Sequence, residues 1–378
     1  MKFIHFSDTH LGFSELSKAD PETGVNQREQ DFYQAWWCAI DKIISIKPDF
    51  VIHAGDLFQT PRPNNRAIAI AFEGIKKLGD ADIPFVVVAG NHSTPRIHQT
   101  GSIFESLNLF EHVFAAWQGK YETFQIGDCA IHCIPHCSFT EELEKACNQI
   151  TKVDGARFQV LTTHGAWREP NRDSIGKIGE FNEQFIENPE SEMDWEFDYI
   201  ALGHYHKNLQ VGPHSWYSGS LERTSFNELG YTSGFMLVDL LKQTNEYISI
   251  PSRPMVAIEP IECEGLTPDD VYKKIAENDA VLPAGAMVKV VLKGLSREMM
   301  LALEMSRIDA CIPSAFYVEK MLIPIETVEL RHIGSSIGAL DDEFRNFMGA
   351  LDESDAPARK AVIELGLSLL HEVENHDS

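Results

Sequence analysis

The chain has 378 residues, of which 43% are apolar and 24% are charged, and its formal net charge is −25. This length allows a main domain of about 200–250 residues with a smaller second one. The composition is that of an ordinary globular protein, which argues against extensive disorder and against a membrane bundle. The acidic balance argues against a surface that binds nucleic acid broadly, because such binding needs Lys and Arg to neutralise phosphates.

Two features bear on location. No apolar run approaches the roughly 20 residues that cross a bilayer, and the first residues, MKFIHFSD, lack the pattern of a signal peptide. The seven cysteines are odd in number and include no CxxC pair, which is typical of a reducing compartment. We therefore expect a cytoplasmic protein without membrane contacts.

Over the first 250 residues, short apolar runs alternate with longer amphipathic segments, as strands alternate with helices in α/β proteins. A helix is predicted to follow the capping-box pair Asn26 and Glu29, with Phe32, Trp36 and Ile40 at helical spacing. The predicted strands cover residues 2–7, 50–53, 85–88, 130–134, 159–163, 199–202, 234–239 and 246–250. The sequence therefore predicts a layered α/β sandwich.

A proline-bounded linker at residues 251–254 predicts a domain boundary. We expect a main domain over residues 1–253, a small α/β cap over 254–325, and a helical C-terminal tail over 326–378. Within the cap, a helix is predicted to start at Thr267, with a strand at 287–292, a helix at 296–308 and a strand at 316–323. The tail pattern, helical at 341–351 and 356–373, suits packing on its own domain or docking on a partner equally well.

Five polar clusters follow predicted strands, in the positions where rigid α/β scaffolds carry reactive groups. They are Ser7-Asp-Thr-His10, Ala54-Gly-Asp-Leu57, Ala89-Gly-Asn-His92, Thr163-His-Gly165 and Gly203-His-Tyr-His206. Each cluster alone is a weak signal. Five of them in order, each after a strand, predict a single site.

The clusters offer a mixed set of nitrogen and oxygen ligands, which suits a divalent ion such as Mn²⁺, Fe²⁺ or Zn²⁺. In an extended stretch, Asp8 and His10 point to the same side and can bind one ion together. Asp56, behind a glycine that permits a tight turn, is the natural bridge between two ions. We assign one ion to Asp8, His10 and His206, and the other to Asn91, His164 and His204. Two such ions favour hydrolysis of a phosphoester.

His92 follows the predicted ligand Asn91 and is expected to remain unligated. The ordinary pKa of histidine, near 6.5, suits a general acid that protonates a leaving alkoxide or contacts phosphoryl oxygens. We therefore predict a catalytic role for His92.

The order and composition of these clusters, over about residues 1–250, resemble the calcineurin-like metallophosphoesterase superfamily. Within it, Gly55-Asp-Leu-Phe58 and Ser218-Gly-Ser-Leu-Glu-Arg223 look like the double-strand-break repair nuclease branch, the SbcD-type exonucleases. The assignment of ligands to the two ions matches that family's pattern. The resemblance also implies Mn²⁺ as the activating metal, DNA ends or hairpins as substrate, a homodimer, and a coiled-coil ABC ATPase of the SbcC type as partner.

The chain departs from this pattern at two positions. Gln59 stands where many of these nucleases carry a histidine that positions the DNA backbone, and Ser93 stands where Asp is usual. Neither change removes a predicted ligand. Gln59 and the acidic balance motivate an alternative, a phosphodiesterase for small molecules such as cyclic nucleotides. Ser93 motivates another, a DNA-repair scaffold with a weakly active metal site.

Three further sets of residues are noted. The basic residues near the clusters are mostly expected to be solvated surface charges: Arg62, Arg66, Arg96, Arg168, Arg172, Lys207 and Arg223. Strand alternation predicts core positions, not a zinc site, for Cys129, His132, Cys133, His136 and Cys137. His5 and His53 lie within predicted strands and are expected to be core histidines with satisfied hydrogen bonds.

Overall fold

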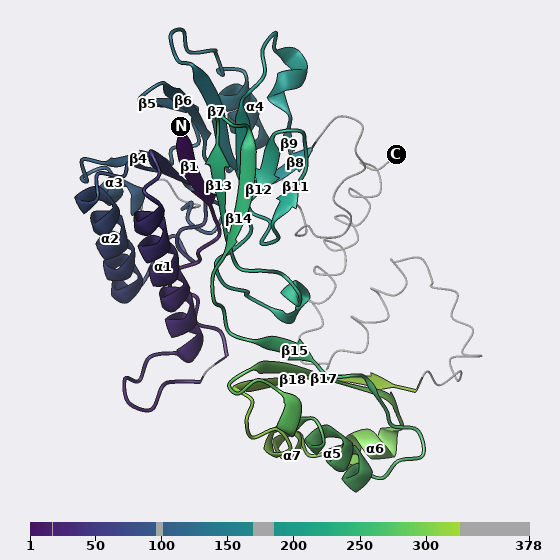
Figure 1. Cartoon of the computed structure of the whole chain (residues 1–378). Coiled ribbons are helices and arrows are strands. Elements are labelled where there is room, and N and C mark those ends of the chain that lie inside the picture. The colour runs from purple at the N-terminus through teal and green to yellow at the C-terminus, as the bar shows by residue number, and fades with distance from the viewer. Residues whose placement is uncertain (17, 96–100, 169–184, 326–378) are drawn as a thin grey trace, which may run out of the picture. The chain divides into compact units, whose positions relative to one another are not determined.

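The computed structural model describes residues 1–16, 18–95, 101–168 and 185–325 (Figure 1). The predicted helices at 341–351 and 356–373 lie outside these ranges, as do Arg96 and Arg172. No helix among the described residues is both long enough and apolar enough to cross a membrane.

The first sheet has six strands in the order β14-β13-β1-β2-β3-β4. Strands β1 to β4 run parallel, whereas β13 and β14 are antiparallel to their neighbours. The bounds are β1 Lys2–Phe6, β2 Phe50–His53, β3 Phe85–Val88, β4 Val113–Ala116, β13 Gly234–Asp239 and β14 Thr244–Ser249. All five predicted strands of this sheet are therefore present, to within two residues.

The second sheet also has six strands, in the order β11-β12-β10-β7-β6-β5. Its four central strands are parallel and the two edge strands antiparallel. The bounds are β5 Glu122–Ile126, β6 Cys129–Ile134, β7 Phe158–His164, β10 Tyr199–Gly203, β11 Leu209–Gln210 and β12 Ser215–Tyr217. The three strands predicted here are its central β6, β7 and β10.

Successive side chains of a strand point to opposite faces of its sheet, and in these strands the side chains on both faces are apolar. The two sheets therefore pack against each other with their inner faces, and their outer faces are left for helices. Phe3 lies between the sheets, where its ring stacks on Phe50 at 4.8 Å between centroids and meets the edge of Tyr199 at 5.4 Å. The next residue, Ile4, points to the other face and packs in the core that includes Trp36 of α1.

Helices cover the outer faces of both sheets. On the first sheet lie α1 (Gln27–Ile46), α2 (Asn65–Asp80) and the short α3 (Phe104–Leu107), with α1 and α2 in contact along their length (Figure 1). On the second lie α4 (Thr140–Cys147), the paired strands β8 (Ala166–Arg168) and β9 (Phe185–Glu187), and the 3₁₀ helix η2 (Pro189–Glu192). The predicted layered α/β sandwich is confirmed.

The predicted N-terminus of α1 is confirmed at Asn26, whose side chain accepts hydrogen bonds from the backbone of Arg28 and Glu29 at 2.8 and 3.1 Å. Glu29 has another role than the predicted capping box. Its Oε1 accepts hydrogen bonds from the Tyr33 hydroxyl and from the Asn64 side chain, at 2.5 and 3.0 Å. Asn64 is itself the N-cap of α2. The same carboxylate therefore joins the starts of both helices.

A third sheet has the order β15-β17-β16, and β18 also pairs with β17. Its strands are β15 Met255–Ala257, β16 Ile261–Glu262, β17 Met287–Leu295 and β18 Tyr317–Pro324, with helix α5 at Pro268–Ala276. The prediction of a single helix over residues 296–308 is wrong. Extended backbone at Leu303 and Glu304, with ψ of 122° and 116°, divides it into α6 (Arg297–Ala302) and α7 (Met305–Ala310).

The described residues form two compact units. One comprises residues 1–261, 269–291 and 304–321, and the other 262–268, 292–303 and 322–325 of the described chain. The residues of the five polar clusters all belong to the first unit. The predicted domain boundary after Arg253 stays a prediction.

Candidate metal centre

The five polar clusters follow the carboxyl ends of β1, β2 and β3 in the first sheet and of β7 and β10 in the second. Backbone hydrogen bonds join the first two clusters, since the amides of Asp8 and His10 donate to the carbonyls of Gly55 and Asp56, both at 3.0 Å. In the second sheet β7 and β10 are adjacent and parallel, with Gly203 opposite His164. The fold thus brings Asp8 and His204, which are 196 residues apart in the chain, to one place.

The backbone of the clusters differs from the extended stretch expected around Asp8 and His10, and that expectation is wrong. Asp8, His10 and Asp56 have φ angles of 52°, 42° and 54°, and His204 has a φ of 110°. These left-handed conformations cost about 1–3 kcal/mol each and persist where surrounding structure imposes them. Here they turn the side chains toward a common point, which alternation along a strand would not do.

Two glycines allow this close approach. A Cβ atom on Gly55, whose φ is 103°, would lie 2.1 Å from Nδ1 of His164. A Cβ atom on Gly90 would lie 2.3 Å from Oδ1 of Asp56. Any side chain at these two positions would displace a predicted ligand.

The hydrogen bonds of His164 and His92 fix which ring nitrogen carries a proton. Nδ1 of His164 lies 2.9 Å from the Ala54 carbonyl, and Nδ1 of His92 lies 3.1 Å from the Gln59 carbonyl. Because a carbonyl can only accept, both Nδ1 atoms donate. The Nε2 atoms of the two rings are left to bind an ion or a substrate.

Glu228 orients His206 in the same way, and sequence reasoning missed it. Its Oε1 accepts a hydrogen bond from Nδ1 of His206 at 2.7 Å, and its Oε2 accepts one from the Thr224 amide at 2.8 Å. Burial alone would raise the pKa of Glu228, but the hydrogen bond and charge of His206 lower it. Glu228 lies in a 3₁₀ turn, η3 (Phe226–Glu228), which carries no sequence pattern that marks a site.

The acidic and imidazole side chains form three groups whose ligand atoms lie within 4.8 Å of one another. These are Asp8 with His10 and His206, Asp8 with Asp56 and His164, and His10 with Asp56 and His92. The first group is the set predicted for one ion. Asp56 belongs to the other two groups, as a shared ligand would.

Several of the shortest distances in the site join nitrogen and oxygen atoms that could bind the same cation. Nε2 of His10 is 3.0 Å from Nε2 of His206. Nε2 of His164 is 2.9 Å from Oδ1 of Asn91 and 3.1 Å from Oδ2 of Asp56. His204 lies beside them, with its ring centroid 5.4 Å from that of His164. This mixture of imidazole, carboxylate and amide donors suits divalent metal ions. His92 lies near enough to His10 and Asp56 to contact one. The assignment of the ligands to two ions stays a prediction.

The charges of the site support this fit. Burial would raise the pKa of Asp56, but the neighbouring His164 and His10 hold it well below its usual range. Burial would lower the pKa of His164, but the charge and hydrogen bond of Asp56 raise it to about 9. The pKa of His206 is likewise raised to about 9, against the effect of burial, by Glu228. The raised pKa values mean that the surroundings of His164 and His206 favour positive charge. A metal ion can supply that charge in place of the protons.

The two residues that depart from the resembled family, Gln59 and Ser93, both lie at the loop that carries His92. The amide of His92 donates to Oδ1 of Asp56 at 2.9 Å, and its ring is held by the backbone of Gln59, which any residue at that position supplies. Ser93 is buried, and its hydroxyl donates to the Phe58 carbonyl at 3.2 Å. Ser93 thus ties the third cluster to the second.

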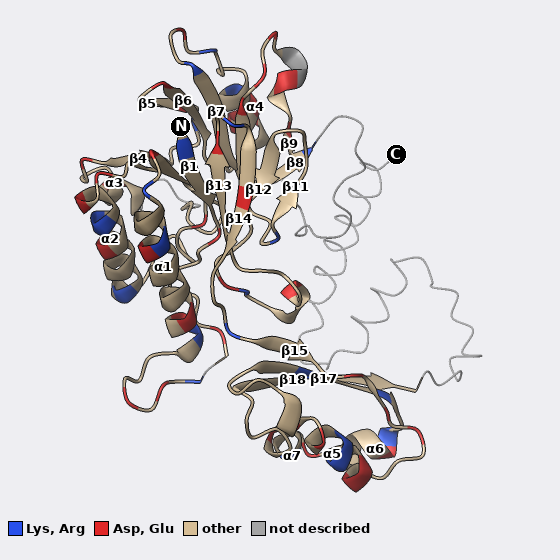
Figure 2. Cartoon of the chain, viewed as in Figure 1, with Lys and Arg blue, Asp and Glu red and all other residues tan. Residues whose placement is uncertain are grey.

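The basic residues near the clusters are mostly paired or dispersed. Arg66 lies 3.8 Å from Glu29, and Arg168 lies 2.8 Å from Glu187. Arg223 is an exception to the surface positions expected for most of these residues, because it is buried and its guanidinium donates to the Ser252 hydroxyl at 3.0 Å. Figure 2 shows Lys and Arg interspersed with Asp and Glu along α2, not gathered on it.

The expected core positions are largely confirmed. Cys129 and Cys133 pack between the sheets, whereas His132 points to the opposite face and contacts Phe197. His136 is the exception, because it lies beyond the end of β6 and is only partly buried.

The two expected core histidines differ. His5 is fully satisfied, since Nε2 donates to the Leu202 carbonyl and Nδ1 faces the Tyr199 hydroxyl, both at 3.1 Å. His53 is half satisfied: Nε2 bonds to the Thr9 hydroxyl at 3.1 Å, and Nδ1 is buried without a partner among the described residues.

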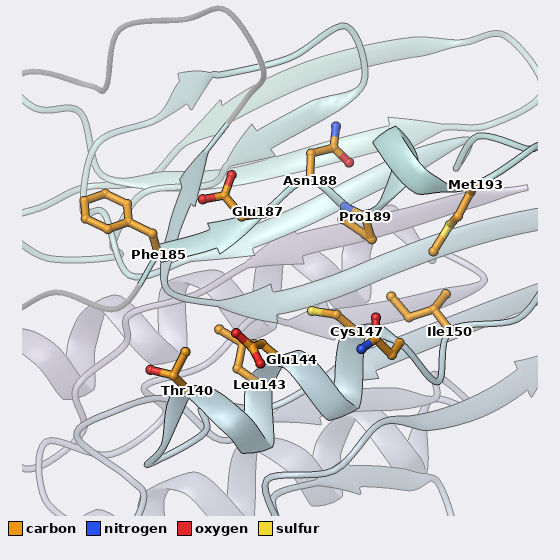
Figure 3. Close-up of a pocket in the computed structure, with 11 residues that line it drawn as sticks. Thr140, Leu143, Glu144, Cys147, Ile150, Phe185, Glu187, Asn188, Pro189 and Met193 are labelled. Carbon is orange, nitrogen blue, oxygen red and sulfur yellow. The ribbon is translucent and has the colours of Figure 1, made fainter.

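A cavity of about 480 Å³ lies apart from these ligands, between α4 and the segment from β9 to η2 (Figure 3). Apolar side chains such as Leu143, Ile150 and Met193 line it, with Glu144 and Glu187 at its rim. None of the predicted ligands lines it, so its size does not make it the reaction site.

Comparison with known proteins adds an independent finding. Residues 1–208 match the family described as calcineurin-like phosphoesterase. Proteins named "DNA double-strand break repair protein Mre11" are similar to the chain. The one from Methanococcus maripaludis is 31% identical, over 64% of this chain and 63% of that protein. The one from Thermoplasma acidophilum is 28% identical over 92% and 89%, and the one from Methanocaldococcus jannaschii is 30% identical over 74% and 72%.

Proposed function

Since the chain belongs to the calcineurin-like phosphoesterase family, we propose that it is a DNA nuclease that hydrolyses phosphodiesters during double-strand-break repair. The observation that carries the proposal is the convergence of the five polar clusters. The first, third and fourth reach Asp56 of the second, and the fifth reaches Asp8 and His10 of the first. The similarity to proteins named for double-strand-break repair supports DNA as the substrate class.

In this proposal the site holds two divalent ions, most readily Mn²⁺, because imidazole nitrogens are mixed with carboxylate and amide oxygens. Asp8, His10 and His206 would hold one ion, Asn91, His164 and His204 would hold the other, and Asp56 would be a ligand of both. When bound, the ions supply a nucleophile at neutral pH and polarise the phosphoryl oxygens. The chain orients the ligands through Glu228, the Ala54 carbonyl and the left-handed turns.

His92 acts on the leaving group. Its Nδ1–H is committed to the Gln59 carbonyl. In the doubly protonated ring, the proton on Nε2 is therefore the one that His92 can give to the leaving oxygen or direct at a phosphoryl oxygen, and the ring returns to its neutral form after the transfer. Its amide is bonded to Asp56 at 2.9 Å, which places the ring next to the shared ligand. The His10 ring, at 4.9 Å between centroids and nearly perpendicular, limits its movement.

The proposal includes DNA ends or hairpins as substrates, a homodimer, cytoplasmic location and a coiled-coil ABC ATPase as partner. With a net charge of −25 the chain has little general attraction for DNA. A separate ATPase that delivers DNA ends would overcome this weakness, and the ions would add positive charge at the site itself.

The test of substrate class compares linear and hairpin DNA with a chromogenic phosphodiester that lacks a nucleobase. We expect cleavage of DNA with Mn²⁺ and none with a chelator. Cleavage of the chromogenic compound with DNA left intact at physiological salt would instead identify a phosphodiesterase for small molecules. No turnover of either substrate by protein with two bound ions would indicate a scaffold.

The role of His92 is tested by His92→Ala, with His112→Ala as the matched control in the loop before β4. We expect DNA cleavage to fall by about 10²–10⁴-fold, the usual contribution of a general acid, while the number of bound ions is unchanged. Robust cleavage by His92→Ala would contradict the acid role. Loss of an ion would show that His92 is a ligand.

A further inference from the structure

A second cavity, of about 360 Å³, lies beside the candidate metal centre. Its walls come from segments that follow β3, β4 and β6, which end at the same edge of the two sheets as the ligand-bearing strands. The residues that matter for its chemistry are Thr94, Trp117, Gln118, Lys120, His136 and Ser138.

Hydrogen bonds attach this cavity to the loop that carries Asn91 and His92. The Thr94 hydroxyl donates to the Gly90 carbonyl at 2.7 Å. The amide of His136 donates to the Ala89 carbonyl at 2.8 Å. Both walls are therefore bonded to residues within three positions of His92, which places the cavity next to the loop that carries His92.

The position of His136 follows from the order of the second sheet. Strands β10, β7 and β6 are consecutive neighbours and parallel, so the residues after them line one edge: His204, then His164, then His136. His136 thus follows the strand next to the one that ends at His164. It lies between the predicted ligands and the cavity, whose wall it helps to form.

The chemistry of the lining is that of a pocket for a nucleobase. Trp117 is half-buried, packs against the helical core of the first sheet and also lines the cavity, where it provides an aromatic side chain. Gln118 and Ser138 supply exposed hydrogen-bonding groups, and Lys120 and Glu142 carry opposite charges, with Glu142 bonded to the Ser138 amide at 3.2 Å. Small-ligand pockets begin at about 300 Å³, so this volume suits one nucleoside. A base within an intact duplex cannot enter such a pocket unless it leaves the stack.

We propose that this pocket binds the unpaired base of the nucleotide that flanks the scissile phosphate, with the base stacked on Trp117. The inference rests on the proposed nuclease function and names a narrower substrate: DNA with an unpaired nucleotide at the cut. Single strands, frayed ends and hairpin loops supply such a nucleotide directly. An intact duplex must first be opened.

Trp117→Ala tests the proposal in the Mn²⁺-loaded full chain. Stacking on an aromatic side chain is worth about 5- to 150-fold per base. We expect kcat/KM for single-stranded DNA to fall by that factor relative to kcat/KM for the base-free chromogenic phosphodiester. Trp117→Phe, which keeps an aromatic ring, should recover most of the loss. Trp37→Ala, on α1, is the matched control for removal of a partly buried tryptophan.

Ser138→Phe is the second variant, at an exposed position on the pocket wall, for the case in which Trp117→Ala does not fold. It fills the pocket and should lower the same ratio. DNA with 2-aminopurine at the unpaired position next to the cut gives a direct readout, because stacking quenches its fluorescence. We expect quenching with the native chain and less with either variant.

The outcomes separate the two proposals. If the native chain cuts no DNA, the proposed function fails and this inference falls with it. If the native chain cuts DNA but both variants keep the native ratio of the two kcat/KM values and the native quenching, the pocket proposal fails alone. An equal loss on both substrates would show that Trp117 supports the fold and does not bind a base.

Discussion

At the scale of single residues, the site depends on the partners of its imidazole rings. His164, His92 and His206 each donate from Nδ1 to an acceptor fixed by the fold, namely the Ala54 carbonyl, the Gln59 carbonyl or the Glu228 carboxylate. A ring held in this way presents Nε2 in one orientation before any ligand arrives. The fold therefore determines which atoms can bind an ion.

Glu228→Ala should weaken this preorganisation. Loss of a carboxylate behind a histidine ligand typically lowers metal affinity by about 10–100-fold. We expect that decrease in Mn²⁺ affinity, measured by titration calorimetry. Glu190→Ala is the matched control, because Glu190 also pairs with a histidine, His214 at 2.9 Å, away from the site. Equal effects of the two substitutions would contradict the role of Glu228.

His5 should make stability depend on pH. Burial lowers the pKa of His5 to about 3, whereas the unfolded chain has the ordinary value of 6.5. Below pH 6.5 the unfolded state therefore binds a proton that the folded state excludes, and this favours unfolding. Because of this one group, the free energy of unfolding should fall as the pH drops below 6.5, with a slope that approaches about 1.4 kcal/mol per pH unit midway between pH 6.5 and pH 3.

The measurement for His5 is urea unfolding at pH 6.5 and 5.5 in the presence of a chelator. The variant His5→Gln should lose less stability between these pH values than the native chain does, and the difference should be about 1 kcal/mol. His112→Gln provides the comparison at a less buried histidine. The same pH dependence in His5→Gln and in the native chain would contradict the assignment.

At the scale of elements, the N-termini of α1 and α2 are each capped by an asparagine and are also joined to each other by a hydrogen bond. Asn26 caps α1, and Glu29 joins α1 to the Asn64 cap of α2. These helices cover the outer face of the sheet whose strands lead into three of the five clusters. The stability of α1 and α2 therefore contributes to the stability of the sheet that carries these clusters.

Asn26→Ala should destabilise the fold while leaving the metal centre intact. Loss of such a cap costs about 0.5–2 kcal/mol, which corresponds to roughly 2–4 °C in Tm per kcal/mol for a domain of this size. Thermal unfolding measures the change. The affinity for Mn²⁺ should be the same as in the native chain, and a large decrease in that affinity would show that α1 positions the ligands directly.

Much of the architecture could be predicted from the sequence, because buried parallel strands such as Phe50–His53 and Phe85–Val88 are short apolar runs that end in polar loops. The predicted metal ligands could also be proposed from the sequence, because they lie in the polar loops that follow these apolar runs. Backbone turns at Asp8 and His10 could not, since left-handed conformations at these residues are imposed by neighbouring segments. Glu228 and Trp117 act through contacts between distant segments, and no local pattern marks them.

At the scale of the whole molecule, the net charge of −25 conflicts with a DNA substrate unless positive charge is added locally. We predict that binding of single-stranded DNA depends on divalent ions. Fluorescence anisotropy with His92→Ala, which should bind without cutting, should show tight binding with Mn²⁺ and a decrease of at least about tenfold with a chelator. Equal binding in the two conditions would indicate a basic surface elsewhere on the chain.

The central claim is that Asp56 joins two metal ions in one hydrolytic centre, and the most direct test counts the ions. Native mass spectrometry of the chain with Mn²⁺ should find two ions per chain. Asp56→Ala should lose at least one of them and all phosphodiester hydrolysis. One ion or none in the native chain, or two ions with full hydrolysis in Asp56→Ala, would contradict the account.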